Sequence, residues 1–514
     1  MDLIADSEDG RDMTPNQHAL LTPQQMTQAD QAAVVAGVPA FRLMAAAGNA
    51  VAEAIRARWS KRPVLVMAGP GNNGGDGFVI AEQLRQHGWP VTLAFMGQID
   101  RMSEEAQAHA KAWQGEWQSL SPMQLEGAEL VVDALFGAGL SRLIEGVAYE
   151  MLEAVVQSGL PVCAVDVPSG LDGTTGQALG MVAKAELTVT FFRKKPGHLI
   201  WPGRFLCGDL LLCDIGIPES VLKGLAINIM ENQVDLWRQD YPWPQQNGHK
   251  FHRGHVLIYG GQWITGASRL SARASQRVGA GLVSLAVPEI SWPIYAASML
   301  SVMVKPLGKN QSEQAFHQVL NDSRFNVVVI GPGAGLDGKD KDRVKQAVLG
   351  TLKCGRACVL DADALTAFSE QPEVLFSAIH GPCVLTPHEG EFARLFPHLS
   401  EPSGKDKLSR AKQAAHETGA VVLLKGADTI IASPDGRAII NTNAPAELAT
   451  GGAGDVLAGF IAGLLAQGMT PFYAAAAAAW LHGEVANEIG VGLIAEDLAD
   501  ALPNVLQRLK AYQD

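Results

Sequence analysis

Short apolar segments alternate with helical segments along this chain, and most of them end in a glycine-rich or acidic turn. In the first half, the expected strands are 64–68, 91–95, 130–132 and 162–165. The expected helices are 41–59, before the first strand, and then 76–87, 103–113 and 149–158. Apolar strands that alternate with helices are typical of a parallel sheet with helices on both faces, so a doubly wound α/β fold is predicted.

The pattern resumes in the second half after an interruption. Residues 218–250 lack periodicity, and the polar, proline-rich stretch 240–248 predicts a linker between two domains. Beyond it, the expected strands are 256–259, 327–330, 358–360, 384–386 and 421–424, and the last expected helices are 456–467 and 474–489. A length of 514 residues is sufficient for two such domains.

Composition excludes several classes of protein. With 47% hydrophobic and 18% charged residues the chain is globular, and a net charge of −13 without a dense basic block excludes a general nucleic-acid binder. None of the six cysteines has zinc-site spacing, so reduced, mostly buried thiols are expected. No apolar segment is long enough to cross a membrane, and residues 1–12 do not resemble a signal peptide. We therefore expect a cytoplasmic protein.

Residues 449–455 read Ala-Thr-Gly-Gly-Ala-Gly-Asp and directly precede an apolar helical segment. Closely spaced glycines let backbone N–H groups turn towards an anion, and the positive end of the helix dipole adds to this potential. A carboxylate is costly at such a place unless it acts as a base. Asp455 is therefore the candidate base for phosphoryl transfer to a hydroxyl group. The alternative is a glycine turn in which Asp455 only caps the helix.

The first half has polar residues after three of its expected strands. The loop 69–77, Gly-Pro-Gly-Asn-Asn-Gly-Gly-Asp-Gly, lacks the dinucleotide-binding glycine register and the Walker lysine, but its amides and carboxylate suit a hard cation or a polar ligand. The ends of parallel strands converge at one edge of the sheet. Asn73, Asp133 and Ser169 are then candidates to share one cation, and Asp166 is a candidate acid or base. A helix cap is the alternative for each acid.

Three segments of the first half, 69–77, 133–139 (Asp-Ala-Leu-Phe-Gly-Ala-Gly) and 166–172 (Asp-Val-Pro-Ser-Gly-Leu-Asp), resemble the NAD(P)H-hydrate epimerase domain. The resemblance covers residues 13–219 and implies a Rossmann-like sheet with a potassium ion held by Asn73, Asp133 and Ser169. It also implies substrate contacts at Asp166 and at Asn72, Asn73, Gly74, Gly75, Asp76, Gly137, Ala138, Gly139, Leu140, Ser141, Arg142 and Leu143, with Tyr149 as a further candidate.

The chemistry of a hydrated nicotinamide fits this resemblance. Its hydroxyl-bearing carbon is bonded to the ring nitrogen, whose lone pair can expel water to form an iminium, and water returning from the other face inverts the centre. This reaction needs an acid–base group, for which Asp166 is the candidate. Lys194 and Lys195 are either phosphate contacts or part of a solvated turn.

The second half carries an ordered set of motifs after its expected strands: Gly260-Gly261, Ile330-Gly-Pro-Gly-Ala-Gly335, Thr386-Pro-His-Glu-Gly-Glu391, Lys425-Gly-Ala-Asp-Thr429 and Thr450–Asp455. They resemble the ADP-dependent NAD(P)H-hydrate dehydratase of the ribokinase-like superfamily, over residues 228–511. The resemblance implies a nucleotide held by Lys425, Gly426, Ala427, Asp428, Thr429, Ala453 and Gly454, with Mg²⁺ on its phosphates. It implies hydrate contacts at Gly266, Gly335, His388 and Asp455, where Asp455 is the base.

Several alternatives stay open in this half. His388 is either a ligand or a hydrogen-bonded structural histidine, and Lys425 is either a nucleotide contact or a surface lysine. Asp361 and Asp363 are candidate helix caps, outside the catalytic set.

Together the two halves predict a bifunctional enzyme that repairs NADH hydrate and NADPH hydrate with ADP. It is expected to act on small molecules, without nucleic acid or membrane, and to form a homo-oligomer. One alternative is an ATP-dependent kinase of a vitamin or sugar alcohol. Another is a first domain that binds its ligand without turnover.

Overall fold

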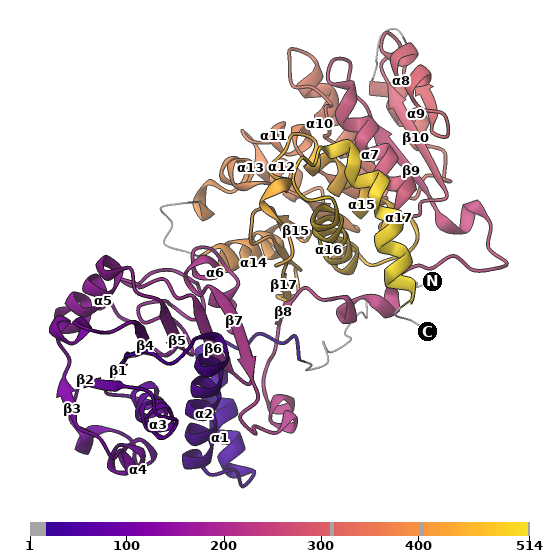
Figure 1. The fold of residues 1–514 in the computed structure, drawn as a ribbon. Helices are drawn as coiled ribbons and strands as arrows, with labels where there is room; N and C mark the ends of the chain where they lie inside the picture. Colours follow the sequence, from indigo (N-terminus) through magenta and orange to yellow (C-terminus); the bar gives the residue numbers. More distant parts are fainter. Residues whose placement is uncertain (1–16, 309–312, 401–405, 512–514) are drawn as a thin grey trace. The chain divides into compact units, whose positions relative to one another are not determined.

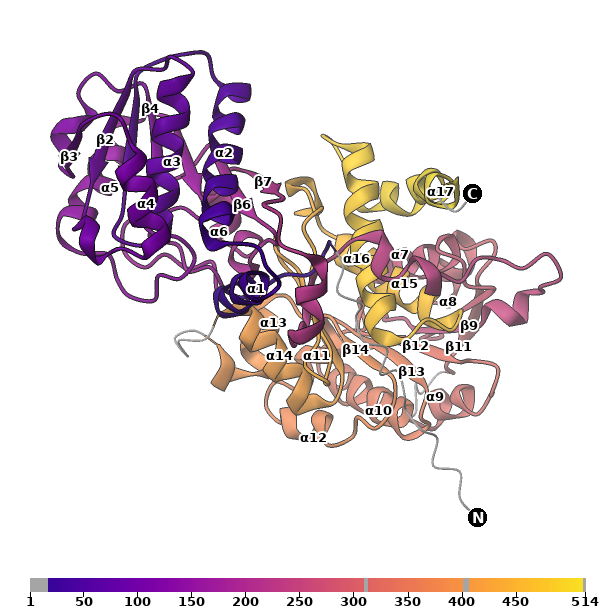
Figure 2. The same ribbon diagram turned by 90° about the horizontal axis from the view of Figure 1, so that it is seen from below.

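The computed structural model describes residues 17–308, 313–400 and 406–511 (Figures 1 and 2). The chain divides into two compact units, residues 1–230 and 231–514. The proline-rich stretch 240–248 lies within the second unit and not between the units, which corrects the sequence-based linker. Aromatic packing explains this position, because the Tyr241 ring lies 6.1 Å from that of Trp237, which in turn lies 5.7 Å from that of Trp480.

The first unit is built on a parallel seven-stranded sheet with the order β3-β2-β1-β4-β5-β6-β7. Its strands are β1 (Val64–Ala68), β2 (Val91–Phe95), β3 (Trp117–Ser119), β4 (Leu130–Ala134), β5 (Val162–Val165), β6 (Leu187–Phe191) and β7 (Asp209–Cys213). Its helices are α1 (Pro23–Val35), α2 (Ala40–Arg58), α3 (Asn72–Gln86), α4 (Glu104–Ala112), α5 (Gly146–Ser158) and α6 (Gly203–Leu206).

Both faces of this sheet are covered, as the apolar strands predict. Alternate residues of a strand point to opposite faces. Val64 and Val66 of β1 join the core under α2, α3 and α4, whereas Leu65 and Met67 join a second core under α5. The doubly wound parallel sheet predicted for the first half is therefore confirmed.

The second unit has a ten-stranded sheet with the order β11-β10-β9-β12-β13-β14-β15-β16-β17-β8. Its strands are β8 (Ile229–Glu231), β9 (His255–Tyr259), β10 (Leu282–Val287), β11 (Met303–Pro306), β12 (Val327–Ile330), β13 (Ala357–Leu360), β14 (Cys383–Leu385), β15 (Val421–Leu424), β16 (Ile430–Ala432) and β17 (Ala438–Ile440). The pairs from β11 to β15 are parallel, and β16 pairs antiparallel with both β15 and β17.

Helices lie on both sides of this second sheet (Figure 2). One group is α7 (Thr265–Arg277), α15 (Ala453–Ala466), α16 (Pro471–Ile489) and α17 (Ala495–Ala511). The other includes α10 (Asp340–Lys353), α11 (Asp363–Thr366), α12 (Pro372–Phe376), α13 (Glu389–Leu395) and α14 (Lys407–Thr418). The shorter α8 (Trp292–Ser298) and α9 (Glu313–Leu320) complete the unit. The predicted α/β class is confirmed here as well.

Four helices begin three or four residues earlier than predicted. The structure starts α3 at Asn72 instead of residue 76, α5 at Gly146 instead of 149, α15 at Ala453 instead of 456, and α16 at Pro471 instead of 474. Glycine disfavours a helix interior, so the first turns of α3 and α15 look like loops in sequence. In α3 the glycine is required by close packing, which outweighs its low helix propensity. A Cβ on Gly74 would lie only 1.8 Å from the Gly69 carbonyl oxygen.

The cysteines follow the prediction with one exception. All six are free thiols, and four are buried, but Cys354 at the end of α10 is exposed. Among the described helices, none combines the length and the apolar character needed to cross a membrane.

Candidate active sites

In the first unit, the predicted cation ligands come from neighbouring strands β1, β4 and β5. Asp133 lies within β4 rather than after its end, a small correction to the sequence assignment. Ser169 donates to Asp133 twice, from Oγ to Oδ1 at 2.6 Å and from the backbone N–H to Oδ2 at 2.8 Å. Asn73, in the first turn of α3, is almost fully buried, and its Nδ2 has no hydrogen-bond partner within the described residues.

The side-chain oxygens of Asn73, Asp133 and Ser169 are of the kind that a hard cation takes as ligands. Burial raises the pKa of Asp133, while its hydrogen bonds with Ser169 lower it, so an added cation would favour the carboxylate form. The side-chain oxygen of Asn73 would lie 3.4 Å from a Cβ on Gly137, beside the same loop. The described chain has no group of three or more His, Cys, Asp and Glu residues able to hold a metal, but this set contains only one such residue and relies on neutral oxygens.

Asp166 is the centre of a second set of contacts, directly after β5. Its Oδ1 accepts from Lys195 Nζ at 2.5 Å and from Thr190 Oγ1 at 3.0 Å, and its Oδ2 accepts from the Ala138 N–H at 3.0 Å. Its backbone has a φ of +66°, a left-handed conformation that is uncommon outside glycine. His198 Nε2 lies 2.8 Å from the Asp166 carbonyl oxygen. Strain of this kind persists where surrounding contacts enforce it.

The ionisation of this cluster follows from its burial and charges. Burial raises the pKa of Asp166, but the Lys195 ammonium outweighs it and brings the pKa to about 2. Burial and the Lys195 charge lower the pKa of His198 to about 4. At neutral pH Asp166 is therefore a carboxylate and His198 a neutral imidazole. Because His198 Nδ1 accepts from the Lys195 N–H, its Nε2 carries the proton donated to the Asp166 carbonyl.

The structure excludes one of the two predicted roles of Lys195. Its side chain is only 2% exposed and ion-pairs with Asp166, so the solvated turn is wrong for this residue. The role of Lys195 stayed open in sequence. Its position in the fold could have indicated that role, because Lys195 follows β6, the neighbour of β5 in the sheet.

Some of the remaining predicted residues of this unit lie close to Asp166, and others are exposed. Burial, followed by the charges of Asp166 and Asp30, raises the pKa of Asp76 well above its usual range. Asp30, on α1, is a member of the cluster that sequence analysis missed. Gly137 and Ala138 lie against Asp166. Exposed positions further along the same segment are Gly139, Ser141, Arg142, Leu143 and Tyr149.

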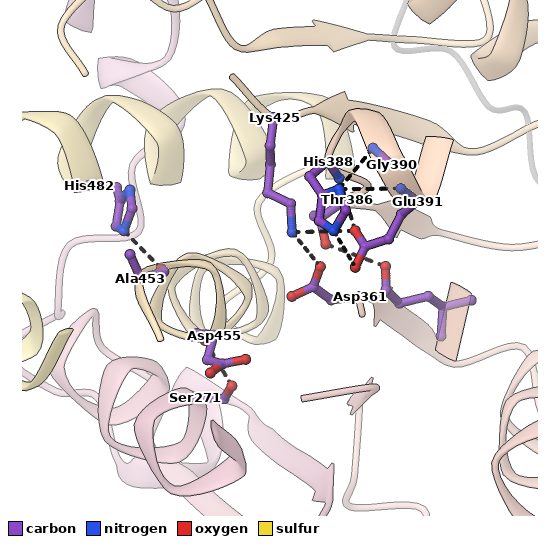
Figure 3. A network of polar contacts seen from close by, with 11 residues as sticks. Ser271, Asp361, Thr386, His388, Gly390, Glu391, Lys425, Ala453, Asp455 and His482 are labelled. Atoms are coloured by element: carbon purple, nitrogen blue, oxygen red, sulfur yellow. Dashed lines mark hydrogen bonds and ion pairs between the residues drawn. The ribbon is translucent and has the colours of Figure 1, made fainter. Parts of the chain in front are cut away.

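In the second unit, Asp455 lies in the first turn of α15, which begins after Gly452 in a left-handed conformation (φ +91°). Ser271 of α7 donates to the Asp455 carbonyl oxygen at 2.8 Å and fixes this turn (Figure 3). Burial and the charge of Asp361 raise the pKa of Asp455 to about 7, although Lys425 acts in the opposite direction. A carboxyl group with this pKa can accept a proton at neutral pH.

Lys425 extends from the end of β15 towards the ends of β13 and β14 (Figure 3). Its Nζ lies 2.8 Å from Asp361 Oδ1 and 3.8 Å from Glu391 Oε2. Burial lowers the pKa of Lys425, but Asp361 and Glu391 outweigh it, and the pKa is raised. A Cβ on Gly454 would lie 3.5 Å from the same Nζ, so the cation faces the glycine turn of α15. The surface-lysine alternative is therefore wrong.

Asp361 and Asp363 do not cap the helix that follows them. Ala362 is the N-cap of α11, it has a φ of +45°, and no side chain caps the helix. Asp361 pairs with Lys425, and Asp363 Oδ2 accepts from the Gly335 N–H at 2.8 Å. Asp361 and Asp363 therefore position two predicted site residues, Lys425 and Gly335, a role that the sequence did not indicate.

His388 is the N-cap of α13. Its Nδ1 accepts from the N–H groups of Gly390 at 2.9 Å and Glu391 at 3.3 Å, while Glu391 Oε2 accepts from the His388 N–H (Figure 3). For Nδ1, His388 is therefore the hydrogen-bonded structural histidine that was the alternative to a ligand. The side chain is 54% exposed, and its other nitrogen, Nε2, lies 3.4 Å from Glu391 Oε1.

The predicted nucleotide segment 425–429 is a closed loop. Thr429 Oγ1 accepts from the Gly426 N–H at 3.1 Å and donates to the Gly426 carbonyl at 2.8 Å. Asp428 is buried and pairs with Lys407 Nζ at 2.5 Å, so its carboxylate is directed into the protein. The Ala453 carbonyl at the start of α15 accepts from His482 Nε2 at 3.0 Å.

Comparison with known proteins agrees with both units. The chain matches the family described as NAD(P)H-hydrate dehydratase over residues 255–507, and that described as YjeF-related protein N-terminus over residues 40–197. The bifunctional NAD(P)H-hydrate repair enzyme of Moorella thermoacetica is 36% identical, over 96% of this chain and 97% of the relative. That of Escherichia coli is 33% identical, over 93% of this chain and 91% of the relative.

The chain belongs to the family of bifunctional NAD(P)H-hydrate repair enzymes.

Two solved structures are similar to part of this chain. An ADP/ATP-dependent NAD(P)H-hydrate dehydratase from Bacillus subtilis, co-crystallised with ATP and Mg²⁺, is 28% identical with a TM-score of 0.48 over 54% of this chain and 98% of that one. A ribokinase-like superfamily protein from Enterococcus faecalis is 25% identical with a TM-score of 0.47, over 55% and 96%.

Proposed function

We propose that this repair enzyme converts hydrated NADH and NADPH back to the working cofactors. The first unit interconverts the R and S hydrates, and the second dehydrates the S hydrate with ADP, releasing AMP and phosphate. The observation that carries the proposal is the environment of Asp455, a carboxyl with a pKa of about 7 in the first turn of α15, where Lys425 faces the glycine turn. The candidate base, Asp455, and a positively charged site for an anion, at Lys425, are therefore both found at the start of α15.

In the second unit, Asp455 would remove the proton of the hydrate hydroxyl. The oxygen would then attack the terminal phosphoryl group of ADP, and AMP would leave. The ring nitrogen expels phosphate from the new ester, and loss of a proton from the neighbouring carbon restores the double bond. The Lys425 ammonium lies where it would offset charge on the phosphoryl group. Mg²⁺, when bound on the phosphates, supplies further positive charge.

In the first unit, Asp166 would receive a proton from the water that adds to the iminium. The departing hydroxyl needs a proton, and Asp76, whose pKa is raised well above its usual range, is the candidate donor. Lys195 keeps Asp166 ionised. Potassium, when bound by Asn73, Asp133 and Ser169, supplies positive charge beside these carboxyl groups.

The alternative, an ATP-dependent kinase of a small alcohol, would use the same base and anion site. It gives no role to the Asp166 cluster in the first unit, so the repair reaction is favoured. We place the epimerase domain at residues 13–219 and the dehydratase domain at 228–511, in a cytoplasmic homo-oligomer.

The test is recovery of dihydronicotinamide absorbance from a purified mixture of NADH hydrate epimers. Enzyme is added with Mg²⁺, K⁺ and either ADP or ATP. Full recovery with ADP, and formation of AMP and phosphate, supports the proposal. A phosphorylated alcohol that persists, without recovery of absorbance, would instead identify a kinase.

The dehydratase is expected to depend on pH through Asp455. With a pKa of about 7, its base form is lost as the pH falls below that value, so kcat/KM for the S hydrate should drop about tenfold for each further pH unit. The measurement is kcat/KM between pH 5 and 9 at saturating nucleotide. A profile that is flat between pH 5.5 and 8 would contradict a base role for Asp455.

Potassium removal is expected to affect only the first unit. Dialysis into sodium buffer should slow epimerisation about tenfold or more, because the oxygens of Asp133, Ser169 and Asn73 lose their cation. Dehydration of pure S hydrate serves as the control and should be unchanged. Recovery of epimerisation on adding back K⁺ completes the test, and equal rates in both buffers would exclude the site.

A further inference from the structure

Lys407, the first residue of α14, lies directly beneath the loop 425–429. Its side chain is buried, with 9% of the residue exposed. Its Nζ donates to Asp428 Oδ1 at 2.5 Å and to the Lys425 carbonyl at 3.4 Å. A Cβ on Gly426 would lie 2.3 Å from this Nζ. The ammonium group therefore contacts three of the five residues of the loop.

Lys407 and Lys425 have different partners. Lys407 Nζ pairs with Asp428 of the loop, whereas Lys425 Nζ pairs with Asp361 and faces the glycine turn of α15. A buried ammonium is costly to desolvate and is retained when its partners are fixed around it. Its removal would take away the ammonium that pairs with the buried Asp428 carboxylate and contacts the backbone of the loop.

We propose that Lys407 is a positioning residue for the nucleotide, which it serves by fixing the loop 425–429 without touching the ligand. The inference rests on the proposed function, because that function assigns the loop to ADP. Small displacements of a binding loop have large kinetic effects. Lys407→Met should therefore raise the KM and Kd of ADP about tenfold, while the KM of the hydrate changes less than about twofold.

The same helix offers a matched control. Arg410, one turn after Lys407, is also buried and forms a fork with Glu389, at 2.9 Å and 3.0 Å. Glu389 is the first residue of α13, directly after His388 and outside the loop 425–429. Arg410→Met removes an equally buried cation but leaves the nucleotide loop intact, so it should not raise the Kd of ADP.

A double variant separates positioning from stability. Lys407→Met with Asp428→Leu replaces the whole pair by apolar groups, which usually recovers the stability lost when one partner is removed. The melting temperature should return towards the wild-type value while the ADP Kd stays raised. This variant also keeps the test valid if Lys407→Met alone does not fold.

The measurements are ADP titration, steady-state kinetics with ADP and S hydrate, and thermal unfolding of each variant. A wild-type ADP Kd in Lys407→Met, the same rise in Arg410→Met, or full recovery of the Kd in the double variant would each overturn the inference. Epimerase activity of the first unit monitors folding independently. Wild-type protein that fails to bind ADP would overturn the proposed function, and the inference with it.

Discussion

Asp455→Asn is expected to lower ADP-dependent dehydration by about 10²- to 10⁴-fold, the usual range for loss of a general base. The amide keeps the shape of the side chain but accepts no proton from the hydrate hydroxyl. Nucleotide binding should persist, because Lys425 and the loop 425–429 are unchanged. The measurement is single-turnover recovery of absorbance from S hydrate. An Asn variant within tenfold of wild type would contradict the assignment.

The same variant is expected to be more stable than wild type at pH 8. The folded-state pKa of Asp455 is about 7, against 3.8 for an ordinary aspartate side chain, so the folded chain binds this proton more tightly than the unfolded chain. The tighter binding of this proton by Asp455 contributes fully to stability below about pH 4, and the contribution is lost as the pH rises to about 7. The advantage of Asn should grow over that window and then stay constant. Thermal unfolding at pH 5 and pH 8 measures it and shows that the inactive variant is folded.

Asp166→Asn is expected to lower epimerisation by about 10²- to 10⁴-fold. Asparagine tolerates the φ of +66° at this position, so the backbone can keep its conformation. With ADP present, fast recovery should then stop when the S hydrate is consumed, and the R hydrate should follow at the uncatalysed rate. Fast and complete recovery would contradict a role for Asp166.

Lys195→Met provides the companion variant for the first unit. Loss of the ammonium removes the interaction that holds the pKa of Asp166 at about 2, so burial would raise it. Epimerisation should fall and become dependent on pH, while dehydration of pure S hydrate in the second unit stays at the wild-type rate. Unchanged epimerase activity would show that the ion pair is dispensable.

Sequence patterns predicted the elements more reliably than the contacts between them. The strands 64–68, 91–95, 162–165, 327–330 and 421–424 match the structure residue for residue, because buried parallel strands are continuous apolar segments. Eight strands were not expected: β3, β6, β7, β8, β10, β11, β16 and β17. β7 carries the apolar run 210–213, yet none of its residues is buried.

The candidate sites were predicted only as far as strand-end residues can indicate them. Asn73, Asp133 and Ser169 were expected to converge because parallel strands end at one edge of a sheet, and the Ser169–Asp133 bonds agree with this. The ion pairs of Lys195 with Asp166 and of Lys425 with Asp361 depend on which strands are neighbours. No periodicity encodes that order, so the roles of both lysines stayed open in sequence.

The early start of α3 makes the length of the Asn-Asn-Gly-Gly-Asp segment as important as its composition. Successive residues of a helix are rotated by about 100°, so one inserted residue between Gly71 and Asn73 would turn the Asn73 amide away from Gly137. A single deletion would rotate it the other way. Among relatives that keep this activity, the segment should tolerate substitutions at some positions but no change in residue number, whereas surface loops of the same unit can vary freely in length.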